Sequence, residues 1–115
     1  MRRGEIRWVD LDPARGSEAG KVRPAVVVSN DGANATAERL GRGVITVVPV
    51  TSNVERIYPF QVLLEARDTG LERRSKAQAE QIRSISVDRL GKQAGQVPAA
   101  VMTLLDEAIR LHLAL

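Results

Sequence analysis

Two side chains able to bind a phosphate group stand at the ends of two strongly apolar stretches. Arg23 is followed by Pro24 and the apolar residues 25–28, whereas Thr51 follows the apolar residues 43–50. If these stretches are antiparallel neighbours in a sheet, the start of the first lies beside the end of the second. A guanidinium can bind two phosphate oxygens, and a hydroxyl can donate to a third. The pair therefore indicates a site for an anionic phosphate.

Arg23 lies where a polar segment with a glycine at each end, residues 16–20, becomes a stiff strand. Pro24 fixes its own backbone and restricts Arg23 to extended conformations. A functional group on a loop that a rigid element braces is a usual arrangement of a binding site. Two alternatives stay open from these segments alone. Arg23 could be a surface arginine that flanks a strand, and residues 51–53 could be a simple polar turn.

A third polar group occupies residues 80–83. In a strand, Gln81 and Arg83 would share one face, and Glu80 and Ile82 the other. The alternative is ordinary surface charge on a half-exposed strand. The single histidine, His112, falls on an apolar stripe, which favours a partly buried structural residue over a ligand.

The composition narrows the class of protein. A chain of 115 residues predicts one domain, residues 1–115, and a single Trp, Tyr and Phe predict an aliphatic core. The absence of cysteine excludes disulfides, thiolate metal sites and cysteine nucleophiles, and one histidine leaves little for a metal site. We therefore expect neither metal nor cofactor. The net charge of +3 permits a polyanionic partner without requiring one.

No apolar run approaches the roughly 20 residues of a membrane span, and the start of the chain lacks the apolar segment of a signal peptide. We expect a cytoplasmic protein without a membrane partner.

The remaining pattern predicts short strands and one clear helix. The predicted strands are residues 5–11, 25–29, 43–50, 56–65 and 93–97. Pro59 argues for an edge position or a bulge in the fourth of these. Residues 30–43 are expected to form a long loop with one weak helical turn at 35–40, and residues 66–74 are expected to form a charged turn. Residues 75–82 could form a strand or a helix. Residues 87–90 are expected to form a short helix capped by Ser86.

A helix is predicted at residues 98–115, and Pro98 is suited to its first position. One stripe carries Val101, Leu105, Ala108, Ile109 and His112. Asp106 and Arg110 are spaced to pair on the solvent side. The other side of the stripe, with Met102, Ile109 and Leu113, could serve a partner subunit. Together, the short strands and the terminal helix predict a small, mostly antiparallel, partly closed barrel with a docked C-terminal helix. This is a mainly β (α+β) fold.

Five fragments in register carry a resemblance that covers nearly the whole chain. They are Gly16-Ser17-Glu18, Arg23-Pro24 with residues 25–29, Val48-Pro49-Val50-Thr51, Tyr58-Pro59-Phe60, and Glu80-Gln81-Ile82-Arg83-Ser84-Ile85. Together they resemble the MazF/PemK family of toxin endoribonucleases, the mRNA interferases of type II toxin-antitoxin systems.

The resemblance implies an SH3-like barrel with attached helices, in a homodimer. It implies metal-independent cleavage of single-stranded RNA, often mRNA, at short sequences, which leaves a 2′,3′-cyclic phosphate and a 5′-hydroxyl. It also implies a cognate antitoxin that blocks the active groove.

The resemblance further implies roles for individual residues. Its catalytic arginine and threonine match Arg23 and Thr51, and its RNA-contacting loop matches Ser17 and Glu18. A second RNA-binding segment matches Glu80, Gln81 and Arg83. Some family members carry a histidine before the arginine, where this chain has Val22, so a mechanism that uses that histidine is excluded.

In-line attack of a ribose 2′-hydroxyl on the adjacent phosphorus would use these groups. Arg23 would stabilise the developing charge, contributing about 3–4 kcal/mol, and Thr51 would donate to a non-bridging oxygen. Glu18 and Glu80 are both candidates for the base. Few aromatic residues are present to stack on bases, so reading the RNA would rely on loop amides and on Ser17, Glu18, Asn53 and Gln81.

Two other functions use the same kind of fold. CcdB-like toxins have this barrel, bind DNA gyrase and catalyse nothing, but they lack the Arg-Pro and Thr pair. A catalytically inactive RNA-binding module is the third possibility.

Overall fold

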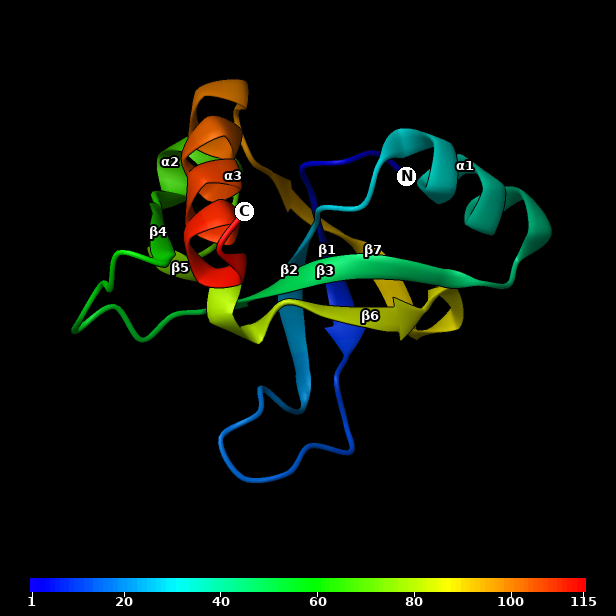
Figure 1. Ribbon diagram of the computed structural model, residues 1–115, viewed down its shortest axis with the longest axis horizontal. Coiled ribbons are helices and arrows are strands. Elements are labelled where there is room, and N and C mark those ends of the chain that lie inside the picture. The colour runs from blue at the N-terminus through cyan, green and yellow to red at the C-terminus, as the bar shows by residue number, and fades with distance from the viewer.

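The computed structural model describes residues 1–115 as a seven-stranded sheet with three α-helices and two one-turn 3-10 helices. The elements are β1 (Glu5–Asp10), β2 (Val22–Val27), α1 (Asp31–Leu40), β3 (Val44–Thr51), β4 (Gln61–Leu64), α2 (Ala66–Thr69), β5 (Ser75–Gln78), η1 (Ala79–Gln81), β6 (Arg83–Ser86), η2 (Val87–Arg89), β7 (Leu90–Gln96) and α3 (Ala99–Leu113). Figure 1 shows α3 over the end of the sheet that holds β4 and β5, with α1 at the opposite end of β3.

The long strand β3 is the centre of the sheet. The strand order is β4-β5-β3-β2-β1-β7, and every pairing is antiparallel. On the edge away from β2, the first half of β3 pairs with β6 and its end pairs with β5. The two terminal strands in the order, β4 and β7, do not pair with each other. The prediction of a mostly antiparallel, partly closed barrel is therefore confirmed.

Burial on both faces explains the continuous apolar runs of β2 and β3. Val26 and Val48 pack into a core cluster that includes Leu105 of α3. Their neighbours Ala25 and Val47 point to the other face, into a second cluster. A strand covered on both sides has no need for alternating polar residues.

The C-terminal helix is confirmed as α3, with Leu105 and Ala108 buried against the sheet. Other details of this helix were predicted wrongly. Asp106 does not pair with Arg110, because its carboxylate accepts from Arg3 Nη2 at 2.6 Å. His112 is exposed, and the buried residues of α3, Leu105 and Ala108, lie before its last turn. No helix of the chain combines the length and the apolar character needed to cross a bilayer.

The three residues expected to face a partner subunit differ in their exposure. Met102 and Ile109 pack against the core, so they are only partly available. Leu113 is exposed, and the most exposed apolar side chains of α3 are Leu104 and Leu111.

Residues 30–43, predicted to be mostly loop, contain the ten-residue helix α1. Its caps are visible in the sequence. Asn30 Oδ1 accepts from the Ala33 N–H at 2.8 Å, and Gly41 adopts φ 65° after the last turn. Asn and Gly are the residues preferred at these two positions, so the helix was predictable from them.

The strand predicted at residues 56–65 is confined to β4 (Gln61–Leu64). Pro59 has no N–H to give to a ladder, and residues 52–60 instead form the β3–β4 loop. Within this loop the rings of Tyr58 and Phe60 stack with centroids 5.3 Å apart.

The region after β4 divides more finely than predicted. Residues 66–74, expected to be a charged turn, contain the short helix α2. Residues 75–82 divide into β5 and the 3-10 turn η1, and β6 is a further strand. The short helix expected at residues 87–90 is the one-turn η2, and β7 begins at Leu90 instead of residue 93.

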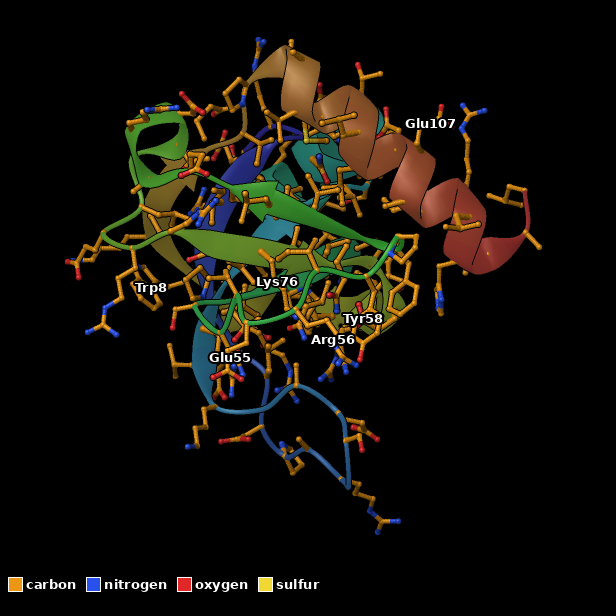
Figure 2. The ribbon with its side chains drawn as sticks, turned by 90° about the vertical axis from the view of Figure 1, so that its left-hand side faces the viewer. Trp8, Glu55, Arg56, Tyr58, Lys76 and Glu107 are labelled. Atoms are coloured by element: carbon orange, nitrogen blue, oxygen red, sulfur yellow. The ribbon has the colours of Figure 1, made fainter.

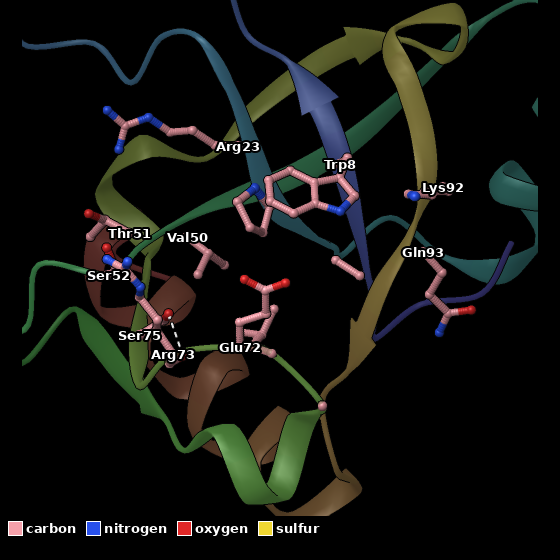
Figure 3. Close-up of a pocket in the computed structure, with 14 residues that line it drawn as sticks. Trp8, Arg23, Val50, Thr51, Ser52, Glu72, Arg73, Ser75, Lys92 and Gln93 are labelled. Carbon is pink, nitrogen blue, oxygen red and sulfur yellow. Dashed lines mark hydrogen bonds between the residues drawn. The ribbon is translucent and has the colours of Figure 1, made fainter.

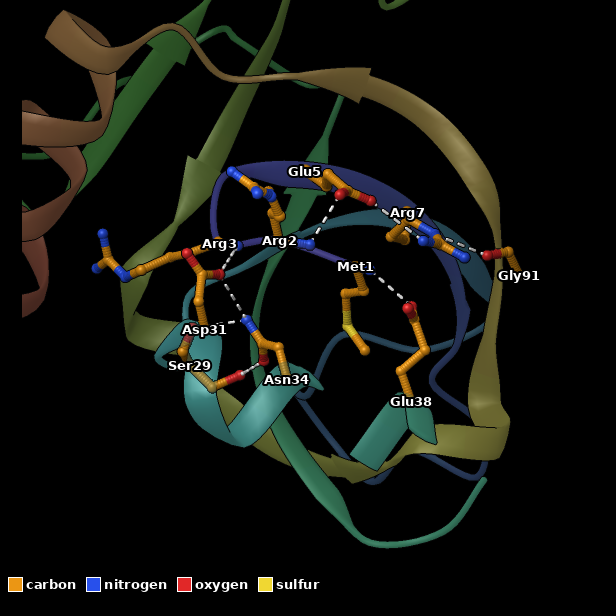
Figure 4. A network of polar contacts seen from close by, with 10 residues as sticks. All are labelled: Met1, Arg2, Arg3, Glu5, Arg7, Ser29, Asp31, Asn34, Glu38 and Gly91. Carbon is orange, nitrogen blue, oxygen red and sulfur yellow. Dashed lines mark hydrogen bonds and ion pairs between the residues drawn. The ribbon is translucent and has the colours of Figure 1, made fainter. Parts of the chain in front are cut away.

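A polar network holds the start of the chain to α1 (Figure 4), and the contact of Arg3 with Asp106 holds it to α3. The Arg3 N–H donates to Asp31 Oδ1 at 2.7 Å, and Arg3 Nε donates to the Val28 carbonyl at 2.8 Å. Asn34, which is fully buried, donates to the Ser29 carbonyl at 2.9 Å. The backbone hydrogen bond from Arg3 holds the pKa of Asp31 below its ordinary value of 3.8.

Replacing Asp31 by Asn tests this network. Because the pKa of Asp31 is lowered in the folded state, its contribution to stability is present above pH 3.8 and is lost as the pH falls through the lowered value. We expect Asp31→Asn to have a lower Tm than the unchanged protein at neutral pH. We also expect its Tm to decrease less as the pH is lowered, as measured by thermal unfolding at a series of pH values. Asp88→Asn, at an exposed position, is the control. Acid profiles of equal steepness in Asp31→Asn and the unchanged protein would contradict the assignment.

Candidate active site

Arg23 and Thr51 come together at the end of the β2–β3 ladder. The ladder pairs Ala25 with Pro49, and two further residues along each strand bring Arg23 opposite Thr51. Both residues line one cleft of about 680 Å³. In Figure 3 they lie on one side of this cleft, with Trp8 near its middle and Lys92 on the far side. Arg23 and Thr51 therefore share the lining of one cleft, as the expected antiparallel pairing of their strands requires.

Arg23 is oriented by the loop that precedes it. Its Nε donates to the Gly20 carbonyl at 2.8 Å, and the residue is half-buried. None of the four ion pairs of the structure involves Arg23. Its two terminal nitrogens make no hydrogen bond to the protein, so both can bind oxygens of a ligand.

Thr51 is oriented by the residues that follow it. Its Oγ1 accepts from the Asn53 N–H at 3.2 Å, which leaves the hydroxyl proton free to donate. Asn53 is exposed, and its Oδ1 accepts from the Glu55 N–H at 3.2 Å. The turn at residues 51–53 is thus an ordered polar turn that also presents a hydroxyl.

Gln81 and Arg83 hold the β1–β2 loop (residues 11–21). The Gln81 Nε2 donates to the Ser17 carbonyl, and its Oε1 accepts from the Ala19 N–H, both at 3.0 Å. Arg83 Nη1 donates to the Leu11 carbonyl at 3.1 Å. Both side chains are thus engaged with the backbone of the loop that carries Ser17 and Glu18.

Four of the residues proposed to bind RNA line a second hollow. This smaller hollow of about 350 Å³ is lined by Glu18, Glu80, Gln81 and Arg83. Glu18 and Ser17 are exposed. Glu80 differs from Glu18, because its Oε2 accepts from Gln61 Nε2 at 2.6 Å and its Oε1 is buried without a partner. The chain has no group of three or more His, Cys, Asp or Glu residues positioned to hold a metal ion.

Sequence reasoning missed Lys76. This lysine is only 8% exposed, and it lies directly opposite Thr51 in the β3–β5 pairing. Its Nζ donates to the Arg56 carbonyl at 2.7 Å. The strand containing Lys76 was ambiguous in the sequence, so its position beside Thr51 could not be inferred from the pattern. Lys92 and Arg73, which line the cleft, were also missed.

The chain is similar to several known proteins over nearly its full length. Residues 2–113 match the family described as PemK-like, MazF-like toxin of type II toxin-antitoxin system. The chain is 71% identical over 113 residues to endoribonuclease MazF9 of Mycobacterium tuberculosis, covering 98% of this chain and 96% of that protein.

Two solved structures from Deinococcus radiodurans have the same fold. The MazF structure is 28% identical and superimposes with a TM-score of 0.82, covering 100% of this chain and 97% of the other. The MazE-MazF structure is 26% identical with a TM-score of 0.75 and covers 100% and 96%. The family match and the full-length relative lead to one conclusion: this chain belongs to the PemK-like, MazF-like family of toxins of type II toxin-antitoxin systems.

Proposed function

We propose that this chain is an endoribonuclease toxin that cleaves single-stranded RNA, mRNA in particular, at a short sequence. The observation that carries the proposal is the meeting of Arg23 and Thr51 at one cleft, with a guanidinium that no carboxylate neutralises. The 71% identical relative named an endoribonuclease supports the same activity. We infer that residues 1–115 act as one domain in the cytoplasm, where mRNA is translated.

The reaction is an in-line displacement at phosphorus. The 2′-oxygen of one nucleotide forms a bond to the adjacent phosphorus while the bond from phosphorus to the 5′-oxygen breaks. The products are a 2′,3′-cyclic phosphate and a 5′-hydroxyl. Two proton transfers are needed, one from the 2′-hydroxyl and one to the leaving 5′-oxygen.

Arg23 and Thr51 stabilise the charge that develops on the phosphorane. The free terminal nitrogens of Arg23 donate to non-bridging oxygens, and the free hydroxyl proton of Thr51 donates to another. A guanidinium offers hydrogen-bond donors and a permanent positive charge, and it does not serve as a proton donor. Its part is therefore electrostatic.

Glu18 is the better candidate for the base. It is exposed on the β1–β2 loop, whereas the Oε1 of Glu80 is buried and its Oε2 is engaged by Gln61. In the proposal Glu18 takes the proton of the 2′-hydroxyl, water gives a proton to the leaving 5′-oxygen, and Arg23 and Thr51 stabilise the charge, so no step uses a metal ion.

RNA would lie between the β1–β2 loop and the β3–β4 loop. The exposed residues Ser17, Glu18 and Asn53 are free to contact nucleotides. Gln81, Arg83 and Glu80 shape the wall of this path, the first two by holding the β1–β2 loop. The bases must be unpaired to be read on their edges, so the substrate is single-stranded.

We also propose two protein partners. The family description supports a cognate antitoxin, and a related toxin from D. radiodurans is solved as MazE-MazF. An exposed apolar hollow between α3 and β4, lined by Leu63, Leu104 and Leu111, supports a homodimer or the antitoxin as its occupant.

Separate substitution of Arg23 by Ala and Thr51 by Val tests the mechanism. Loss of one donor aimed at the developing charge costs about 10²–10³-fold in rate, so we expect a fall of that size in kcat for Arg23→Ala. Thr51→Val keeps the shape and removes the hydroxyl. Cleavage of a defined transcript is measured in excess chelator, with Arg42→Ala and Thr36→Val, both exposed, as controls.

Full activity of Arg23→Ala would overturn the mechanism, and a requirement for added magnesium would overturn its metal independence. Intact RNA together with inhibition of gyrase would identify a CcdB-like toxin instead. Intact RNA that is nevertheless bound would indicate an inactive RNA-binding module.

Replacing Gln81 by Met tests whether this residue acts through the β1–β2 loop. Met removes both hydrogen bonds that Gln81 makes to Ser17 and Ala19. We expect faster amide hydrogen exchange at Ala19 and a raised KM, with Tm nearly unchanged. Gln96→Met, at an exposed position of β7, is the control. Unchanged exchange at Ala19 combined with a raised KM would mean that Gln81 contacts RNA directly.

A further inference from the structure

We propose that Lys76 is a second phosphate-binding residue, which holds a backbone phosphate of the RNA beside the scissile one. The inference deepens the proposed function and rests on it. It starts from a buried lysine that the proposed mechanism does not use.

The position of Lys76 mirrors that of Arg23. Lys76 is the direct partner of Thr51 across the β3–β5 pairing, so both side chains leave the same face of the sheet. Directly opposed Cβ atoms lie about 4.5–5.5 Å apart. Continuing the β2–β3 register two residues beyond the Ala25–Pro49 pair places Arg23 toward Thr51 on the other neighbouring strand, β2. The hydroxyl of Thr51 therefore has a cationic residue on each side.

The charge of Lys76 is not balanced by the protein. A lysine that is 8% exposed normally has a carboxylate partner, because burial of an unpaired charge is costly. None of the four ion pairs includes Lys76. Its ammonium has three N–H donors, and the structure gives it one hydrogen bond, to the Arg56 carbonyl at 2.7 Å. The face of the Tyr58 ring, 6.0 Å away, supplies only a weak additional attraction.

In this proposal the anion approaches Lys76 from the side of the β3–β4 loop. Figure 2 shows Lys76 with Arg56 and Tyr58 of the loop close by. These loop residues are exposed, and the hydrogen bond from Lys76 is the one that ties residues 54–57 to the sheet. A phosphate oxygen is a stronger acceptor than a neutral carbonyl, so a bound RNA phosphate can use the free donors of Lys76 or replace Arg56 as its partner.

Lys76 could instead be only a tether for the β3–β4 loop. The two roles make different demands on the side chain. A tether needs a donor to the Arg56 carbonyl, whereas phosphate binding needs the positive charge. Lys76→Gln keeps a donor without the charge, Lys76→Arg keeps the charge, and Lys76→Met keeps neither.

The test measures the salt dependence of RNA binding. The cleavage site of the unchanged protein is first mapped on a transcript. A short RNA containing that site, with a 2′-deoxy nucleotide at the scissile position, then serves as a probe that cannot be cut. Its affinity is measured over a series of potassium chloride concentrations for the unchanged protein, the three Lys76 variants and Arg42→Gln, an exposed control at the other end of β3.

We expect the slope of log K against log salt to become shallower by about 0.7 in Lys76→Gln and Lys76→Met, the value for one lost phosphate contact on a single strand. The slope should be preserved in Lys76→Arg and Arg42→Gln. We also expect at least a tenfold fall of kcat/KM in Lys76→Gln with Tm within a few degrees. If Lys76→Met fails to fold, Lys76→Gln gives the same measurement.

Slopes in Lys76→Gln and Lys76→Met equal to that of the unchanged protein would overturn the proposal, and a loss of activity confined to Lys76→Met would assign Lys76 to the tether. Failure of the unchanged protein to cleave any transcript would overturn the proposed function itself, which separates the two outcomes.

Discussion

The antiparallel register between β2 and β3 is the constraint on which the site depends. It aligns Ala25 with Pro49, Val26 with Val48 and Val27 with Val47, and it brings Arg23 opposite Thr51 two residues further on. A slip of one residue would turn every side chain of a strand to the other face of the sheet. A slip would also turn Arg23 to the face of Val26 and Val48, where the first core cluster packs, and burial of an unpaired charge there opposes it.

The same sheet determines how charge gathers around Thr51. Lys76 on β5 is paired with Thr51 on β3, and the β2–β3 register, continued beyond Ala25 and Pro49, places Arg23 on the other side of Thr51. Neither cation has a carboxylate partner, so each keeps its attraction for an anion. Electrostatic stabilisation by groups already held in place needs little rearrangement during the reaction, and the sheet supplies that rigidity.

Much of this arrangement was predictable from the sequence. The apolar runs that became β2 and β3 predicted the meeting of Arg23 and Thr51, and the stripe with Leu105 and Ala108 predicted α3. The helix α1 was underestimated because its interior is rich in Ala, Asn and Gly, although Asn30 and Gly41 marked its ends. The exposure of His112 depends on where the sheet stops beneath α3, which periodicity within the helix does not encode.

Some site residues could be predicted from the sequence and others could not. A pattern shows which residues end a strand, but the hydrogen bonds of Gln81 to the β1–β2 loop and the position of Lys76 beside Thr51 arise from pairings between distant segments. These pairings join β3 to β5 and η1 to the β1–β2 loop. Short segments with few apolar residues give weak periodic signals, so such contacts came from the fold alone.

The proposed mechanism requires Arg23 and Thr51 to act on one phosphodiester. A double-mutant cycle on kcat/KM for RNA cleavage, with Arg23→Ala, Thr51→Val and the double variant, tests it most directly. Groups that act together on one transition state are strongly non-additive, so the double variant should be little worse than the more damaged single variant. A loss in the double variant equal to the product of the two single losses would show that the residues act independently, and would contradict the account.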